Sequence, residues 1–205
     1  MKSKTAEVKH SRGSSEWFTP TRFTDAAREV MGGIDLDPAS CAEANEYVQA
    51  TRYFTKEYDG RLQKWIADSV WLNPPGGEKG RSGQEEWFGY AEREYKAGNA
   101  KQIIFMMFNS SGTETEWFQG ALGNYPICYV NQRIKFTPAA GAYETSKRND
   151  PVHGNAIIYL GPNNARFSEV FSKFGKVIPA WLQMGIEYYE ILNAVLVRMN
   201  GGVIK

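Results

Sequence analysis

Short apolar segments alternate with helical patterns along the chain, and this alternation predicts an α/β fold built on one sheet. Residues 103–108 form a continuous apolar run, which is typical of a buried central strand. Further apolar segments predict strands at residues 34–37, 70–72, 127–130, 133–136 and 156–160. Apolar residues at helical spacing predict helices at residues 20–31, 40–50, 87–97, 165–174 and 180–199.

Capping residues indicate where several of these helices begin. Thr19 precedes Pro20 and is predicted to cap the first helix, which Gly32 ends. The other predicted caps are capping boxes, formed by Ser40 with Glu43 and by Thr113 with Glu116.

The length of 205 residues favours one main domain. We expect a polar arm at residues 1–16, a domain at 17–179 and a helical extension at 180–205, with the chain a monomer or a weak homodimer. Hydrophobic residues make up 42% and charged residues 23%, as in ordinary globular proteins. Because the formal net charge is only +1, any nucleic-acid surface must be a local patch.

Several classes of protein are disfavoured by the composition. No apolar run approaches the roughly 20 residues of a membrane span, and the first 16 residues are polar, unlike a secretory signal. Cys41 and Cys128 are far apart, and His10 and His153 are the only histidines, so we expect no metal site and a reducing, cytoplasmic setting. A G-x-G-x-x-G motif is absent, which disfavours a dinucleotide site.

The most informative motif is Asn73-Pro74-Pro75, at the end of a predicted strand. Proline has no N–H, so this turn presents carbonyl oxygens without donors. The Asn73 amide oxygen and the Pro74 carbonyl can both accept hydrogen bonds from one planar NH₂ group. Such contacts localise the lone pair of the nitrogen, which then attacks a methyl group on a sulfonium. Catalysis of this kind acts by positioning and fixed dipoles. The structural alternative is a rigid surface turn.

Two other motifs suit a sulfonium donor that also carries an ammonium, a carboxylate and a ribose. Asp35 and Asp37, before Pro38, offer carboxylates for the ammonium or hydroxyls. The helix N-terminus after Thr19 offers N–H groups for the donor carboxylate. The alternatives are that Asp37 and Thr19 only cap helices.

These motifs together resemble the phage-type DNA N6-adenine methyltransferases. The similar blocks are Glu16-Trp17-Phe18-Thr19-Pro20, Asp35 to Ser40, Tyr53-Phe54-Thr55, Asp59-Gly60-Arg61-Leu62, Trp65, Val70 to Pro75, Arg133 to Phe136 and Asn155 to Leu160. The resemblance implies a Rossmann-like, S-adenosylmethionine-dependent fold with a single mixed sheet flanked by helices. It implies methyl transfer to adenine N6 of a flipped base in DNA, in a bacterial or phage-infected cell. Matched position by position, it implies catalytic residues Asn73, Pro74 and Pro75 and donor-binding residues Trp17, Thr19, Pro20, Asp35, Asp37 and Pro38.

One position departs from the family pattern. An aromatic residue usually follows the two prolines and stacks on the base, but this chain has Gly76. The missing face would remove about 1–3 kcal/mol of base binding. Trp87, Phe108 or Trp117 can replace it, or else each of the three packs in the core.

Candidate DNA contacts lie in two polar loops and beside them. The predicted phosphate-binding residues are Lys79, Arg81, Arg133, Lys135, Lys147 and Arg148. Three alternatives to the adenine methyltransferase remain open. One is a catalytically degenerate module that binds the donor or nucleic acid, as Gly76 suggests. Another is methylation of another planar amine, such as cytosine N4, RNA or a protein amide. The third is an interaction protein with no small-molecule ligand.

Overall fold

The computed structural model describes residues 17–75, 83–108, 114–138 and 153–180. The predicted arm at residues 1–16, the Thr113 cap and nearly all of the predicted helix at 180–199 lie outside these residues.

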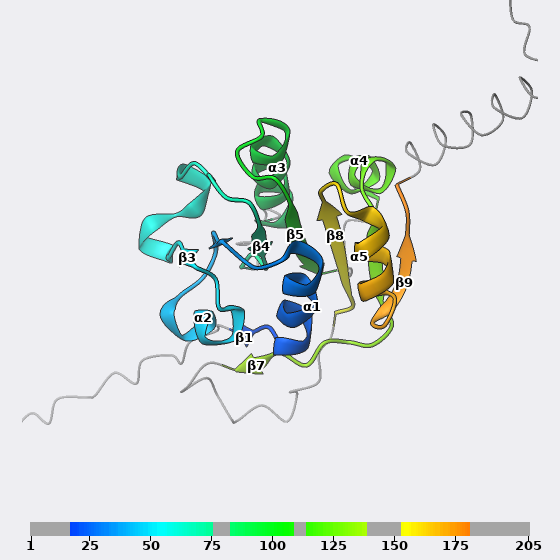
Figure 1. The fold of residues 1–205 in the computed structure, drawn as a ribbon, viewed down its shortest axis with the longest axis horizontal. Coiled ribbons are helices and arrows are strands. Elements are labelled where there is room, and N and C mark those ends of the chain that lie inside the picture. Colours follow the sequence, from blue (N-terminus) through cyan, green and yellow to red (C-terminus); the bar gives the residue numbers. More distant parts are fainter. Residues whose placement is uncertain (1–16, 76–82, 109–113, 139–152, 181–205) are drawn as a thin grey trace, which may run out of the picture.

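One seven-stranded mixed sheet forms the centre of the molecule (Figure 1). Its strands in spatial order are β3 (Arg52–Tyr53), β2 (Leu36–Asp37), β4 (Val70–Leu72), β5 (Ile103–Phe108), β8 (Asn155–Leu160), β6 (Ile127–Val130) and β9 (Gly175–Ile178). The first four are parallel, β8 is antiparallel to β5 and β6, and β9 is antiparallel to β6. The predicted mixed α/β architecture is therefore confirmed. A separate antiparallel ribbon pairs β1 (Trp17–Phe18) with β7 (Thr137–Pro138).

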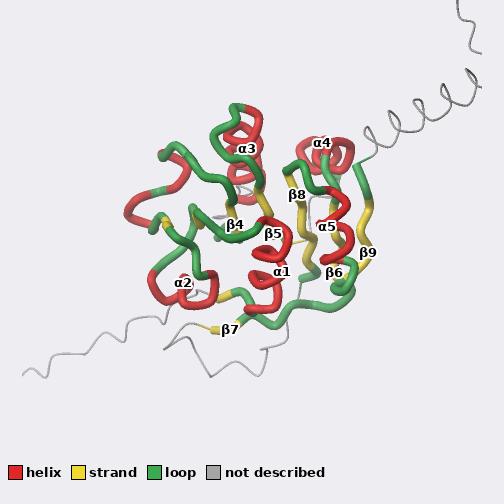
Figure 2. Tube along the Cα trace, in the orientation of Figure 1, coloured by secondary structure: helices red, strands yellow, loops and turns green. Residues whose placement is uncertain are grey.

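Helices cover both faces of the sheet (Figure 2). One face packs against α1 (Thr21–Met31), α2 (Ala42–Val48) and α5 (Asn164–Phe171). The other packs against α3 (Gly83–Lys96) and α4 (Glu116–Asn124). Two short 3₁₀ helices, η1 (Lys56–Tyr58) and η2 (Gly60–Leu62), lie between β3 and β4.

The central strand β5 shows why its sequence is apolar throughout. Ile104 and Met106 belong to the core beneath α1 and α5. Ile103, Phe105 and Met107 belong to the core beneath α3 and α4. Because successive strand residues point to opposite faces, a strand covered on both sides needs apolar residues at every position.

Some helix ends differ from the capping predictions. The N-cap of α1 is Pro20, one residue after Thr19, and no side chain caps this helix. The N-cap of α2 is Cys41, whose sulfur accepts a hydrogen bond from the Ala44 N–H, so the predicted Ser40 capping box is wrong. The N-cap of α4 is Thr115. Gly32 ends α1 as predicted, in the left-handed conformation that glycine adopts easily.

Two strand predictions also need correction. Residues 133–136 form no strand, although Ile134 is fully buried, because this segment packs against the α1 and α5 core without pairing to the sheet. Strand β9 was not predicted. It depends on pairing with β6, where Gly175 lies so close to Tyr129 that a Cβ would be 1.9 Å from the Tyr129 carbonyl oxygen.

Candidate active site

The carboxyl ends of β2, β4 and β5 meet at one edge of the sheet, because these strands are parallel. This carboxyl edge is the lower edge of the sheet in Figure 1, where α1 begins and the β1–β7 ribbon lies. Asp37 ends β2, Asn73 directly follows β4, and Phe108 ends β5. Three predicted or candidate functional residues therefore lie along one edge of neighbouring strands.

Asn73 is held by a residue far away in the sequence. Its Nδ2 donates a hydrogen bond of 3.0 Å to the hydroxyl oxygen of Thr19, 54 residues earlier. Thr19 is only 4% exposed, Asn73 is half-buried, and the following Pro74 is buried. This bond uses the nitrogen of the amide, and Oδ1 is the atom of the same group that accepts hydrogen bonds.

Asp37 is a buried carboxylate, 3% exposed. Burial raises its pKa from 3.8 to about 7, and the Ala39 N–H, which donates to it over 3.1 Å, only partly offsets this rise in pKa. Ser40 also lowers the pKa slightly, although its hydroxyl makes no hydrogen bond of good geometry. No cationic side chain of the described residues contributes. A ligand with a positive charge would therefore stabilise the ionised form of Asp37.

Asp35 lies at the opposite edge of the sheet. Its carboxylate accepts hydrogen bonds from the backbone N–H groups of Asp68, at 2.8 Å, and Ser69, at 3.2 Å, just before β4 begins. A hollow of about 430 Å³ at this edge is lined partly by Asp35, Asp68 and Lys101. Asp68 and Lys101 pair with each other at 2.5 Å. Asp35 thus fixes the turn that leads into β4.

The turn at Pro38 is supported by the block around Gly60, residues 59–65, whose role could not be inferred from the sequence. A Cβ on Gly60 would lie 2.1 Å from the Pro38 carbonyl oxygen, so only glycine fits there. The Trp65 indole N–H donates to the Gly60 carbonyl over 2.8 Å. Beside them, Arg61 pairs with Asp59 at 2.7 Å and with Glu86 of α3 at 2.8 Å.

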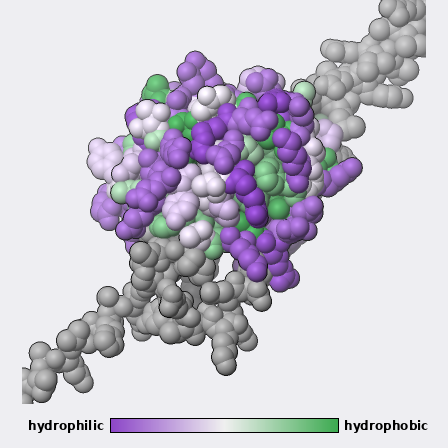
Figure 3. Space-filling view, turned by 60° about the horizontal axis from the view of Figure 1, so that its bottom comes forward, coloured by the Kyte–Doolittle hydropathy of each residue, from purple (hydrophilic) through white to green (hydrophobic). Residues whose placement is uncertain are grey.

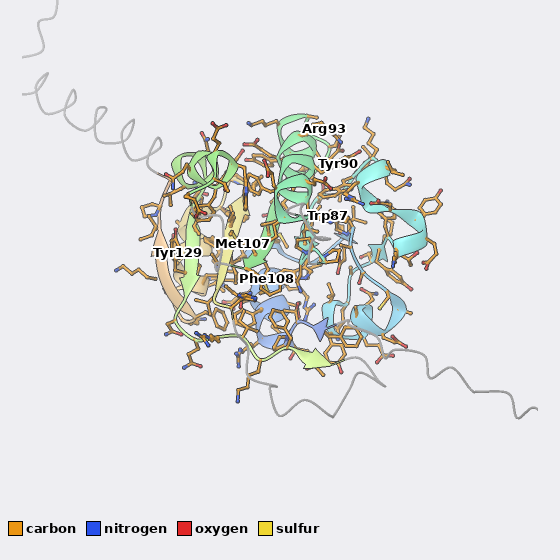
Figure 4. All side chains as sticks on the ribbon, turned by 180° about the vertical axis from the view of Figure 1, so that it is seen from behind. Trp87, Tyr90, Arg93, Met107, Phe108 and Tyr129 are labelled. Atoms are coloured by element: carbon orange, nitrogen blue, oxygen red, sulfur yellow. The ribbon has the colours of Figure 1, made fainter. Side chains whose placement is uncertain are left out.

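The three aromatic candidates for base stacking lie in different places. Trp87 is 5% exposed, packs against Trp65 and belongs to the α3 and α4 core, and Trp117 packs against the same core. Phe108 is half-buried at the carboxyl edge, at the lower end of β5 in Figure 4.

Two aromatic rings that were not singled out for stacking lie beside Phe108. Its ring centroid is 6.2 Å from that of Phe136 and 5.9 Å from that of His153. Only the fold reveals this cluster, because Phe136 and His153 approach Phe108 from the two ends of a long connection.

Cationic side chains gather near the β6 and β9 end of the carboxyl edge. Arg133 and Lys135 are exposed on the chain that leaves β6, and Lys176 is exposed on β9. The hydrogen bond from the Asn131 N–H to the Phe174 carbonyl holds the two segments together. Figure 3 turns this edge toward the viewer and shows hydrophilic surface on its right-hand side. The other predicted DNA contacts lie outside the described residues: Lys79, Arg81, Lys147 and Arg148.

The remaining donor-site residues flank the same edge. The backbone of Trp17 pairs with Pro138 in the β1–β7 ribbon, but its side chain lies outside the described part of the structure. Pro20 is the N-cap of α1, and Pro75 is exposed after the buried Pro74. Within the described residues, no group of His, Cys, Asp and Glu has the geometry to hold a metal, and no helix is long and apolar enough to cross a membrane.

Comparison with known proteins identifies the family. The model of the DNA N-6-adenine-methyltransferase (Dam) family matches residues 4–170, which include every described element from β1 to β8 and most of α5. No individual curated protein matches the chain. Because the match covers most of the 205 residues, the chain belongs to the DNA N-6-adenine-methyltransferase (Dam) family.

Proposed function

We propose that this chain transfers the methyl group of S-adenosylmethionine to N6 of a flipped adenine in DNA, on a Rossmann-like fold. Family membership supports the reaction and the DNA substrate. The hydrogen bond between Asn73 and Thr19 at the carboxyl edge carries the assignment of the site.

The strand order supports a Rossmann-like fold. From β2 the chain goes to β3 on one side and then returns to β4 on the other, so the order of strands reverses between β2 and β4. In open α/β sheets, ligands bind outside the carboxyl ends of the strands at such a reversal. Asp37 is the last residue of β2, and Asn73 directly follows β4.

The residues on the β2 side of the reversal fit the methyl donor. Asp37 is a buried carboxylate without a cationic partner among the described residues, so it suits the donor's ammonium or hydroxyl groups. The N-terminus of α1, beginning after Thr19 and Pro20, suits its carboxylate. Pro38 and Trp17 complete this proposed site. When bound, S-adenosylmethionine supplies an electrophilic methyl group on a positive sulfur.

The residues on the β4 side hold the acceptor. Asn73 Oδ1 and the Pro74 carbonyl oxygen accept hydrogen bonds from the two N–H groups of the adenine amino group. These bonds direct the lone pair of the amino nitrogen toward the donor site. Because an adenine inside a duplex cannot reach this edge, the base is flipped out of the stack. Phe108 supplies the stacking face that Gly76 lacks, and Pro75 stiffens the turn.

Cationic residues hold the DNA around the flipped base. Arg133 and Lys135 contact phosphates from the β6 side of the edge, and Lys79, Arg81, Lys147 and Arg148 are proposed to do so as well. These contacts to the DNA backbone position the target adenine.

Product analysis tests the proposal. The purified chain is incubated with unmethylated DNA and labelled S-adenosylmethionine, and the DNA is digested to nucleosides. We expect N6-methyladenine from the wild-type chain, a loss of at least about a hundredfold in Asn73→Ala, and donor binding by calorimetry within threefold of wild type in that variant. Asn124→Ala, at the exposed last residue of α4, is the matched control with wild-type activity. A product of N4-methylcytosine, or full activity in Asn73→Ala, contradicts the proposal.

A further inference from the structure

We infer that Thr19 is a positioning residue, which fixes the orientation of the Asn73 amide while its own hydroxyl proton is directed to the donor's carboxylate. This inference rests on the proposed function and adds a link between the donor site and the acceptor site.

Thr19 is placed to act as a rigid anchor. It is 4% exposed and lies between β1, which pairs with β7, and Pro20, the N-cap of α1. The Phe23 N–H donates to the Pro20 carbonyl over 3.0 Å, and this bond fixes the first turn of the helix. Thr19 itself caps nothing, so its hydroxyl is used for Asn73.

The orientation of the Asn73 amide decides which of its two polar atoms faces the substrate. An Asn side chain has an acceptor oxygen and a donor nitrogen of nearly equal shape, and a rotation of 180° exchanges them. Asn73 Nδ2 donates to Thr19 Oγ1 over 3.0 Å, which turns the oxygen of the amide away from Thr19. In the opposite orientation, the NH₂ group of Asn73 would face the NH₂ group of adenine, and neither could accept.

The same hydroxyl also has a proton to donate. Accepting from Asn73 uses a lone pair of Thr19, and among the described residues no hydrogen bond from the Thr19 hydroxyl to an acceptor is seen. The proposed donor site includes the N-terminus of α1, which Pro20 alone separates from Thr19. A donor carboxylate that accepts this proton holds the hydroxyl with its lone pair toward Asn73. Donor binding thereby prepares the amide for the base.

Kinetics of Thr19 variants test the inference. Thr19→Val keeps the shape and removes the hydroxyl, whereas Thr19→Ser keeps the hydroxyl. A neutral hydrogen bond changes an equilibrium by roughly two- to twelvefold. We therefore expect Thr19→Val to lower kcat by about tenfold at saturating donor, with Thr19→Ser within about threefold of wild type. Thr19→Ala serves if Thr19→Val does not fold.

A matched control separates positioning from packing. Thr24 is also buried in α1, where its hydroxyl donates to the Thr21 and Tyr47 carbonyls at 3.0 Å. Thr24→Val removes a buried hydroxyl of the same kind away from Asn73. We expect this variant to lower the melting temperature and leave kcat unchanged.

The Asn73→Asp background gives a second readout. A carboxylate accepts through either oxygen, so it needs no orientation. If Thr19 orients the amide, Thr19→Val costs less in kcat in this background than in the wild type.

The outcomes distinguish this inference from the proposed function. Full activity in Asn73→Ala overturns both. Loss of activity in Asn73→Ala together with unchanged kcat and weaker donor binding in Thr19→Val overturns only the positioning role. A matching fall in kcat in the Thr24→Val control also overturns it.

Discussion

Gly60 and Pro38 touch through their backbones, at a distance that no other residue at position 60 would permit. A Cβ at this position would lie 2.1 Å from the Pro38 oxygen and 2.9 Å from the Pro38 Cβ. Pro38 directly follows Asp37 of the proposed donor site. The block around Gly60 therefore supports the donor site from outside it.

Gly60→Ala is expected to move the turn at Pro38. The backbone overlap should lower the free energy of unfolding by about 1–3 kcal/mol, the usual cost of overpacking. It should also weaken donor binding severalfold, because Asp37 moves with Pro38. Denaturant unfolding and calorimetry with the donor measure the two effects.

Gly89→Ala is the matched control for this prediction. Gly89 lies within α3, and nothing lies within 4 Å of a Cβ built there. Alanine is the better helix former, so this variant should gain roughly 0.5–1 kcal/mol. Equal stability of Gly60→Ala and the wild type would contradict the close contact.

Asp37 should make stability depend on pH. Its folded pKa of about 7 lies above the unfolded value of 3.8, so between these two pH values the folded state holds a proton that the unfolded state has lost. The free energy of unfolding should therefore fall as pH rises from about 4 to 7, and this contribution should be constant above 7. Asp37→Asn should flatten that part of the curve. A difference between the two proteins that does not change with pH would contradict the assignment.

Donor affinity should also depend on pH through the Asp37 carboxylate, but it should rise with pH where stability falls. Only the ionised form of Asp37 attracts a cation, so donor affinity should fall as pH drops below about 7, and binding should release a proton. Calorimetry in two buffers of different ionisation enthalpy measures the released proton. Asp37→Asn should release none; proton release equal to wild type in that variant would exclude Asp37 as its source.

Phe108 should act on the base and leave the donor unaffected. Phe108→Ala removes a stacking face worth about 1–3 kcal/mol, so kcat/KM for DNA should fall by roughly one to two orders of magnitude. Phe108→Tyr should restore most of the activity, and donor affinity should stay within twofold in both variants. An unchanged kcat/KM in a folded Phe108→Ala chain would return Phe108 to a purely structural role.

Arg133 and Lys135 should contribute to the salt dependence of DNA binding. Each phosphate contact that is lost should reduce the slope of log affinity against log salt by about 0.9 for a duplex. Arg133→Ala with Lys135→Ala should therefore reduce the slope by up to about 2. Lys101→Ala, at the opposite edge where Lys101 pairs with Asp68, should leave the slope unchanged. Equal slopes in the wild type and the double variant would exclude both phosphate contacts.

The sequence alone predicted those elements whose patterns are local. Strands β4, β5 and β6 match their predicted bounds, because each is a continuous apolar run whose residues pack into the cores on both faces of the sheet. The short strands β3 and β9 contain too little pattern of their own and depend on pairing with distant residues. Residues 133–136 have the apolar pattern of a strand because Ile134 is buried, but they do not pair with the sheet.

The candidate site was only partly predictable for the same reason. Asp37 ends a strand and Asn73 follows one, so their positions at one edge could be expected once the strands were identified. The use of Thr19 by Asn73 could not, because a Thr before Pro is locally indistinguishable from a helix cap. Asp35 and Asp37 are two residues apart and lie at opposite edges, since a strand as short as β2 separates them.

The reversed direction of β8 has a consequence for how such a protein can evolve. Because β8 runs opposite to β5 and β6, its first residue, Asn155, lies at the edge where the chain leaves β6. The connection from β6 to β8 therefore starts and finishes at the carboxyl edge, and its last residue precedes Asn155, which pairs with Phe108. Relatives can exchange or lengthen this connection, and so acquire a new preference for sequence around the target, while every strand pair of the sheet is inherited intact.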